Sequence, residues 1–196
     1  MLVRWEAEGG PLPGMWLEAS ARAGRQETDF STDDILYNGA GASFRISGSY
    51  WGLHGGVGRR WRPGGADGAF TLDLGARVFW SRQKGSEATV NLDRIRLEDA
   101  DSLRVRVGGR LSLDAGSPAS PYIGAYFERE FDGAVRGYVN GIPLETPTLK
   151  GNTGIFELGV RLKPSPDGPL SIELGALGYA GRREGFSGTL NVRLEF

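Results

Sequence analysis

The last seven residues alternate strictly between apolar and polar side chains and end on an aromatic residue. The apolar positions are Leu190, Val192, Leu194 and Phe196. A period of two places all four on one face of a β-strand, since successive side chains in a strand point to opposite faces. The pattern therefore predicts a strand rather than a helix. Taken alone, it fits a lipid-facing strand of an outer-membrane barrel and the last strand of a soluble β-protein equally well.

The same alternation recurs along most of the chain and predicts an all-β fold. Alternating stretches lie at 3–8, 15–24, 70–81, 103–114, 122–131, 156–163 and 170–179. Residues 42–62 alternate as well, but the apolar parity changes near 48–50. We interpret 42–62 as one long strand with a bulge or bend at that point, which glycine permits. Two strands joined by a tight turn are the competing interpretation.

Short and long connections alternate along the chain between these strands. Short segments rich in glycine and proline lie at 9–14, 63–68, 116–121 and 164–169. Longer polar segments lie at 27–40, 84–100 and 140–150, and the second has room for a small strand at 89–92. Short periplasmic turns and long extracellular loops are typical of outer-membrane barrels. The order of the connections therefore favours a barrel that spans a membrane.

The two faces of the predicted strands differ in character. Aromatic residues on the apolar parity gather towards strand ends, as in the interfacial girdles of membrane barrels: Trp51, Trp61, Phe70 and Trp80. The opposite parity is charged and predicts a wet lumen. The candidate lumen-lining residues are His54, Arg77, Arg104, Arg106, Arg110, Glu128, Glu157 and Glu173. A soluble β-sandwich or a ligand-binding barrel remains an alternative.

Composition sets further bounds. At 196 residues the chain fits a single domain, 1–196, in which 1–13 is interpreted as a truncated strand and turn and 14–196 as the main barrel strands. The net charge of −1 gives no electrostatic case for a nucleic-acid partner. Cysteine is absent, so no disulfide or thiolate metal site is expected. The start of the chain lacks the basic flank and apolar core of a signal peptide, so we expect an upstream part.

Several strand motifs resemble those of autotransporter β-domains, from about residue 14 to the terminal phenylalanine. The motifs are MWLEA (15–19), YWGLHGGVG (50–58), LDLGAR (72–77), SLRVRVG (102–108), PYIGAYFE (121–128), GIFELG (154–159) and GYAGRREG (178–185). Each motif alone is common among barrels, and their order together with Phe196 gives the resemblance its specificity.

The resemblance implies a twelve-stranded barrel in the bacterial outer membrane. In this family the barrel anchors an upstream passenger domain at the cell surface and helps to translocate it, and a helical linker threads the pore. It also implies outer-membrane lipid and the barrel-assembly machinery as partners, with the terminal strand as the assembly signal. The present chain departs from the family by showing only about eight full strands and part of a ninth. We expect that N-terminal strands are missing, or else that the chain closes alone as a smaller barrel.

The sequence gives little indication of catalysis or cofactor binding. His54, the single histidine, could serve a porin-like or hydrolase barrel with Ser43 or Ser47, but no nucleophile motif accompanies it. Its glycine neighbours are expected to make room for an aromatic side chain from an adjacent strand, or to let the wall bend. The acidic residues at 93–101 lack calcium-loop spacing. We therefore expect no enzyme, no cofactor and no metal site.

Overall fold

The computed structural model describes residues 1–37, 40–64, 68–90, 92–113, 118–145, 148–165 and 168–194, with side chains omitted at 33, 35–37, 40 and 42. Within these ranges the chain is built from β-strands and turns. None of the described residues belongs to a helix that is long and apolar enough to cross a membrane.

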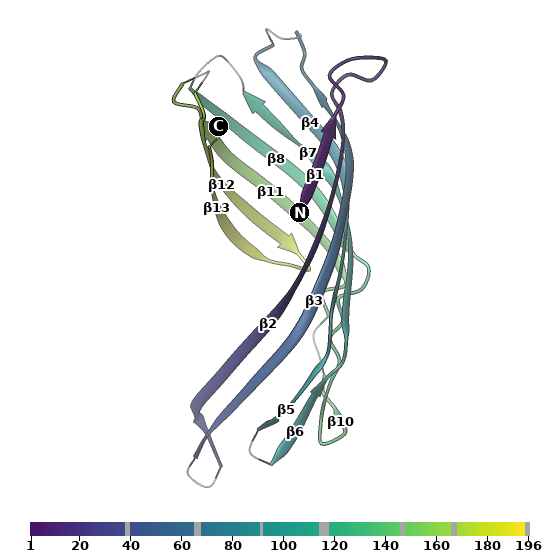
Figure 1. Cartoon of the computed structure of the whole chain (residues 1–196), viewed down its shortest axis with the longest axis vertical. Coiled ribbons are helices and arrows are strands. Elements are labelled where there is room, and N and C mark those ends of the chain that lie inside the picture. Colours follow the sequence, from purple (N-terminus) through teal and green to yellow (C-terminus); the bar gives the residue numbers. More distant parts are fainter. Residues whose placement is uncertain are drawn as a thin grey trace.

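Nine of the described strands form one antiparallel sheet in the order β1-β2-β3-β4-β7-β8-β11-β12-β13. Their bounds are β1 Leu2–Glu6, β2 Met15–Tyr37, β3 Ala40–Trp61, β4 Phe70–Gln83, β7 Ala100–Leu113, β8 Ala119–Glu130, β11 Gly151–Leu162, β12 Leu170–Gly181 and β13 Gly185–Leu194. The sheet curls into a half-barrel, with β1 and β13 at its two edges (Figure 1). The predicted all-β antiparallel architecture is confirmed. Pairing of β1 with β2 runs over the whole of β1.

A smaller sheet lies at one end of the half-barrel, beside the far part of the β2–β3 hairpin (Figure 1). Its strands, in the order β10-β9-β6-β5, are β5 Ser86–Val90, β6 Asp93–Leu97, β9 Gly137–Val139 and β10 Ile142–Pro143. The prediction of a long loop at 27–40 was wrong, because β2 continues to Tyr37. The predicted strand at 89–92 exists but lies earlier, as β5, and pairs with β6 in the second predicted loop.

The interpretation of 42–62 as one strand is confirmed by β3, which runs without interruption from Ala40 to Trp61. The predicted break near 48–50 was wrong, since Gly48 pairs with Gln26 and Tyr50 with Gly24 in a continuous register. The irregularity in this hairpin lies instead on β2, between Thr32 and Leu36.

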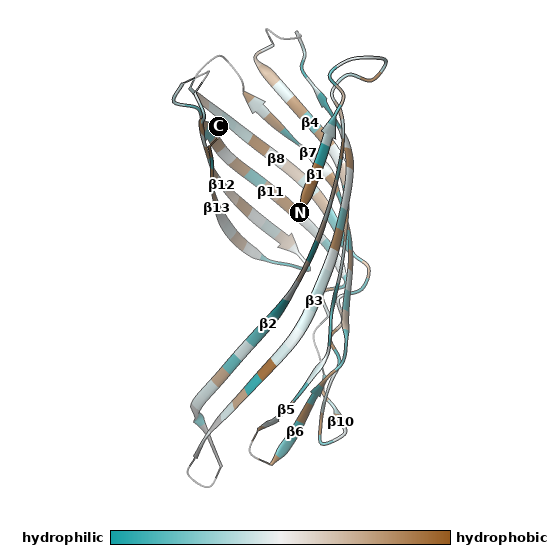
Figure 2. Ribbon diagram, viewed as in Figure 1, coloured by the Kyte–Doolittle hydropathy of each residue, from teal (hydrophilic) through white to brown (hydrophobic). Residues whose placement is uncertain are grey.

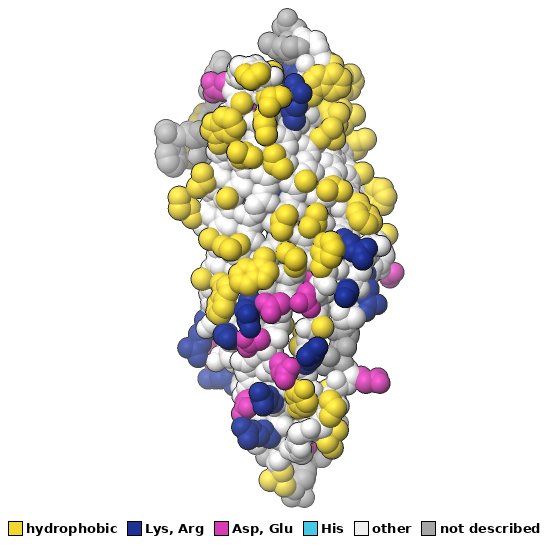
Figure 3. All heavy atoms as spheres, turned by 90° about the vertical axis from the view of Figure 1, so that its right-hand side faces the viewer, with side chains coloured by type: hydrophobic (Ala, Val, Ile, Leu, Met, Phe, Trp, Pro, Cys, Tyr) yellow, Lys and Arg dark blue, Asp and Glu magenta, His cyan; other side chains and the backbone are white. Residues whose placement is uncertain are grey.

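The convex face of the large sheet is apolar and exposed. Figure 3 shows hydrophobic side chains spread over most of this face, with charged side chains gathered towards the end that carries the small sheet. Exposed fractions reach 57% at Leu53, 63% at Ile123 and 63% at Leu158. Figure 2 shows the alternation of hydrophilic and hydrophobic positions along the same strands. The buried hydrophobic residues of the described chain lie on the opposite, concave side and number three: Trp16, Tyr122 and Ile155.

The polar concave face as candidate functional site

Strand pairing aligns the inward-facing residues into rows that cross the sheet. One row runs from Glu18 on β2 through Gly56 on β3, Arg77 on β4 and Arg106 on β7 to Glu128 on β8. The Arg77 Nε donates to Glu18 Oε1 at 2.7 Å. The Arg106 Nε and Nη2 donate to Glu128 Oε2 at 2.9 and 2.8 Å. Each end of this row therefore carries a hydrogen-bonded arginine–glutamate pair.

Glu128 is the most deeply buried acidic residue of the described chain. Its side chain is 2% exposed. Besides Arg106, it accepts a hydrogen bond on Oε1 from Arg183, which follows β12. Burial of an ionised carboxylate requires such partners, because an unpaired buried charge is costly. Glu128 therefore ties the β12–β13 turn to β8 across the intervening β11.

A second group of ion pairs surrounds Arg110, on β7. Its Nη2 donates to Glu157 Oε1 at 2.6 Å, and its Nη1 donates to Glu173 Oε1 at 3.0 Å. Arg161 donates to the other oxygen of Glu173 at 3.0 and 3.2 Å from Nη2 and Nε. The planar guanidinium of Arg110 thus bridges β11 and β12 from β7, which lies two strands from β11 and three from β12, and this suits its fixed fork of donors.

Trp16 lies on a floor of glycines inside the curl. A Cβ added at Gly58 would meet its ring at 2.3 Å, and one added at Gly75 would meet it at 2.5 Å. The indole Nε1 donates to Asp73 Oδ1 at 2.9 Å. The guanidinium of Arg4 stands 4.6 Å from the ring centroid, within cation–π range. This fully buried aromatic joins β2 to β4 over the glycines of β3 and β4.

Two tyrosines repeat this arrangement further along the sheet. The Tyr122 ring covers Gly159 and Gly175, where an added Cβ would meet the ring or its hydroxyl at 2.4 and 2.7 Å. The Tyr126 ring covers Gly108, and its hydroxyl donates to Glu157 Oε2 at 2.8 Å. At Gly159 and Gly175 an aromatic residue occupies the space where a side chain would stand, whereas at Gly108 an added Cβ would first meet the Ala125 carbonyl oxygen at 2.3 Å.

His54 lies in a row with Ser20, Phe79 and Arg104. Its ring stacks on Phe79 with centroids 4.7 Å apart, and its Nδ1 is 3.4 Å from the Ser20 hydroxyl. Its Nε2 lies 3.3 Å from Glu18 Oε1. The flanking glycines make room for Arg22 at Gly52 and for Glu18 and Arg77 at Gly56. The expectation of an aromatic side chain over these glycines was therefore wrong, since Phe79 stacks on the imidazole instead. The alternative, that these glycines let the wall bend, stays a prediction.

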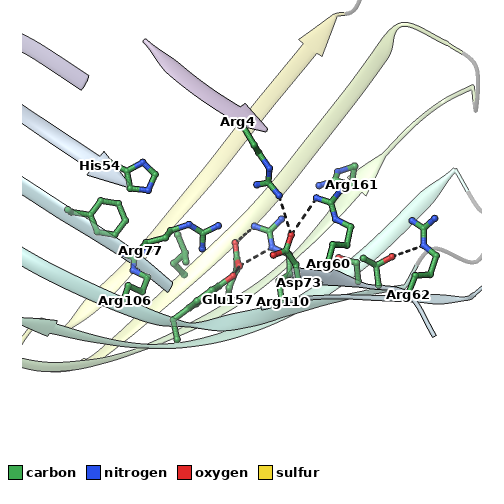
Figure 4. A pocket seen from close by; sticks show the side chains of 15 residues that line it. Arg4, His54, Arg60, Arg62, Asp73, Arg77, Arg106, Arg110, Glu157 and Arg161 are labelled. Atoms are coloured by element: carbon green, nitrogen blue, oxygen red, sulfur yellow. Dashed lines mark hydrogen bonds and ion pairs between the residues drawn. The ribbon is translucent and has the colours of Figure 1, made fainter. Parts of the chain in front are cut away.

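All eight candidate lumen residues lie on this concave face, from β3 to β12, and most of them line or border one cavity. The cavity has a volume of about 600 Å³ and is lined by side chains that include Arg4, His54, Arg60, Asp73, Arg77, Arg106, Arg110, Glu157 and Arg161. Figure 4 shows the arginines converging on Asp73 and Glu157, with His54 to one side. That these residues line a pore in the membrane stays a prediction.

The predicted assembly signal lies on the edge strand β13. Leu190, Val192 and Leu194 are 65%, 64% and 57% exposed on the convex side. Phe196 lies outside the described residues. The role of this strand as an assembly signal stays a prediction.

Outside the large sheet, Asp99 organises the start of the β4–β7 connection. The Gly85 amide donates to its Oδ1 at 3.0 Å, and Lys84 and Arg82 donate to its Oδ2 at 2.8 and 3.1 Å. These hydrogen bonds, first that of Gly85 and then those of Lys84 and Arg82, hold the Asp99 pKa well below its ordinary value. In the structure this carboxylate binds side-chain and backbone donors. No group of acidic or histidine side chains in the described chain has the geometry to hold a metal ion.

Sequence reasoning missed Trp16 and Asp73 as centres of the concave face. Trp16 stands on the polar parity between Met15 and Leu17, and that placement of an aromatic residue was the available signal. Asp73 was visible only as one charged residue among many. Its role depends on Trp16, Arg4 and Arg60, which come from three other strands.

Comparison with known proteins gives two consistent findings. The profile of the autotransporter beta-domain matches residues 5–175. The pertactin autotransporter of Bordetella bronchiseptica is 32% identical over 151 residues, and that of Bordetella parapertussis is 34% identical over 151 residues. In both cases the alignment covers 75% of this chain and 16% of the relative. The chain thus corresponds to a small part of the length of these relatives.

Proposed function

This chain belongs to the autotransporter beta-domain family, and we propose from that membership that it anchors an upstream passenger domain and helps carry it to the cell surface. The family and its pertactin relatives indicate the bacterial outer membrane as its location and a translocator unit as its class. Passenger attachment belongs to the whole protein, since the relatives extend well beyond the matched part. We treat residues 1–196 as one barrel domain.

One observation carries the proposal: a single curled sheet is apolar outside and charged inside. A soluble sandwich buries its apolar faces in a core, whereas here large aliphatic side chains such as Leu53 and Leu158 are mostly exposed on the convex face. Lipid would remove them from water, and the concave charges would face an aqueous lumen. This polarity supports the membrane barrel over the soluble alternatives.

A lipid-embedded sheet also needs both edges hydrogen-bonded, since hydrocarbon offers no partners for backbone groups. We propose that β1 and β13 pair with further strands of the complete barrel. The exposed apolar positions of β13, together with Phe196, would be recognised by the barrel-assembly machinery. Outer-membrane lipid would cover the convex face.

The proposal is tested by fractionating cells that produce the full-length protein. An antibody to residues 186–196 is expected to detect a band in the outer membrane whose gel mobility changes on heating. Replacing Phe196 together with Leu194 by serine should deplete that band, whereas replacing two exposed residues of the small sheet should leave it unchanged. Protein found only in the soluble fraction would refute the membrane assignment.

We assign no catalytic role to the domain. Ser20, His54 and Glu18 lie near one another, but His54 Nε2 makes no hydrogen bond to the described residues although Glu18 is 3.3 Å away. A Ser-His-acid triad needs the acid hydrogen-bonded to the imidazole to orient it. His54→Ala is therefore expected to leave surface display of the passenger intact. Loss of a hydrolase activity in that variant would instead establish an enzyme.

A further inference from the structure

A second hollow, of about 280 Å³, adjoins the cavity on the side nearer the β2–β3 extension. It lies between two neighbouring rows of the sheet. One row contributes Ser20, His54, Phe79 and Arg104, and the next contributes Arg22, Gly52 and Ser81. Arg106 completes the polar lining. All of these residues are among those the structure describes.

The hollow exists because two small residues stand side by side at its floor. Gly52 on β3 pairs with Ser81 on β4, so neither strand fills the space above them. A Cβ at Gly52 would meet the Arg22 Nε at 3.0 Å, which places the Arg22 side chain directly over this floor. The stacked rings of His54 and Phe79 form the adjacent wall.

The donors around the hollow lack matching acceptors. The Arg104 Nε and the His54 Nε2 are buried and make no hydrogen bond with the described part of the chain, although Glu18 Oε1 lies 3.3 Å from the His54 Nε2. The Arg104 Nε is 3.7 Å from Glu130 Oε2, too far for a hydrogen bond. Arg22 is exposed and makes no hydrogen bond or ion pair with any described residue, whereas Arg106 is paired with Glu128.

Charge is unbalanced as well. Three arginines line the hollow, and no described carboxylate does. Two of these arginines have a carboxylate partner that lies outside the lining, since Arg106 pairs with Glu128 at 2.8 Å and Arg104 with Glu130 at 3.7 Å, whereas Arg22 has none among the described residues. Buried donors without acceptors are rare in proteins and mark places where a ligand or ion supplies the missing partner. An oxyanion satisfies guanidinium donors in the fork geometry that arginine presents.

We propose that this hollow binds one carboxylate or phosphate group. The guanidinium groups of Arg22 and Arg104 hold the oxyanion from two sides, and His54 and the Ser20 hydroxyl border it. The site is independent of passenger transport, since it rests on side chains of this domain alone. It adjoins the larger cavity and shares His54, Phe79 and Arg106 with the lining of that cavity, whereas Arg22 and Arg104 line the hollow and not the larger cavity.

The single histidine makes the test site-specific. The full-length protein, folded in detergent micelles and labelled with [13C]histidine, gives an imidazole signal for His54 that is identified by its loss in His54→Gln. Sodium acetate and sodium phosphate are titrated separately at constant ionic strength and pH. We expect a saturable shift of the His54 signal with at least one of the two anions. Acetate alone would identify a carboxylate site, and phosphate alone a phosphate site.

Arg22→Gln and Arg104→Gln are each expected to weaken that binding about tenfold or more, because each removes a charged hydrogen-bond donor. Arg22→Lys keeps the charge and should weaken it less. Arg129→Gln is the matched control, because Arg129 lies outside the hollow, and it should bind as the unmodified chain does. Heat-dependent gel mobility checks that each variant is folded. A shift that does not saturate, or that is equal in all variants, would overturn the proposal.

Discussion

Removing the Trp16 side chain is expected to destabilise the domain and to relieve a steric constraint at Gly75. Trp16 is fully buried. Burial of a tryptophan side chain covers roughly 150–250 Å², and at about 25 cal/mol per Å² this amounts to about 4–6 kcal/mol. Mutational experience with buried large aromatics gives about 3–5 kcal/mol. We therefore expect Trp16→Ala to lower the free energy of unfolding by about 3–5 kcal/mol.

Gly75→Ala tests the same contact by adding a methyl group to the glycine beneath the Trp16 ring. Its new Cβ would stand 2.5 and 2.7 Å from two ring atoms of Trp16, and 3.1 Å from the Val57 carbonyl oxygen. Overpacking of this kind costs about 1–3 kcal/mol. In the Trp16→Ala background both ring contacts disappear, so the added methyl should cost far less. The double variant is thus expected to be more stable than the sum of the two single effects by about 1–2 kcal/mol.

The measurement is equilibrium urea unfolding in detergent micelles, followed by the gel mobility of folded and unfolded chains. Gly55→Ala is the matched control, because nothing lies within 4 Å of a Cβ at that position. It should leave stability nearly unchanged, both in the unmodified chain and in the Trp16→Ala variant. Additive effects of Trp16→Ala and Gly75→Ala would refute the claim that the ring occupies the space above this glycine.

Three further predictions rest on other contacts of the same structure. Glu128→Ala should lower the urea midpoint, with a loss of about 1.5–3 kcal/mol, because two guanidinium groups lose a shared acceptor; an unchanged midpoint would contradict this. Folding lowers the Asp99 pKa, so the ionised carboxylate stabilises the folded chain at pH values above the ordinary pKa of about 3.9. This stabilisation is lost as the pH falls through the folded pKa. Protection of its Gly85 amide partner against hydrogen exchange should therefore persist at about pH 5 and fall only in stronger acid. Because the chain has no cysteine, a Val3→Cys/Ala19→Cys pair should cross-link on oxidation. A Val3→Cys/Val192→Cys pair should not, since the structure places these strands at opposite edges, and a cross-link there would show direct closure.

The alternation of side chains was sufficient to predict the wall of the half-barrel but not its extensions. In the wall, lipid or core contact selects apolar residues at every second position, and the period is visible in the sequence. Beyond the wall, residues 27–32 of β2 are polar on both parities except for Phe30, so this segment carries no period of two. The strand there is held by backbone pairing with β3, including Glu27 with Ser47 and Asp29 with Arg45. The parity change near 48–50 has the same origin. Phe44 pairs and stacks with Phe30 on the inner parity of the extension, without any change in register.

Candidate concave residues could be listed from parity alone, yet their partners could not be derived. Neighbouring strands can be ordered from chain connectivity, and so pairs such as Arg106 with Glu128 lie within reach of sequence reasoning. The contact of Arg183 with Glu128 crosses β11 and depends on how sharply the sheet curls. Curvature itself depends on where rings such as Tyr122 find glycines on the next strands, which one strand's period does not reveal.

The contacts that skip a strand explain why one face is polar and the other apolar. Curling a sheet brings inward side chains of next-nearest strands together and moves outward side chains apart. On the concave side, Trp16 on β2 reaches Asp73 on β4, and Arg110 on β7 reaches Glu157 on β11 and Glu173 on β12. Charged groups on that face can therefore satisfy one another within the protein. On the convex side no such convergence is available, so aliphatic side chains stay exposed and only an apolar solvent can cover them. The same curvature brings the ion-pairing residues together on the inside and leaves the aliphatic side chains on the outside to be covered by lipid.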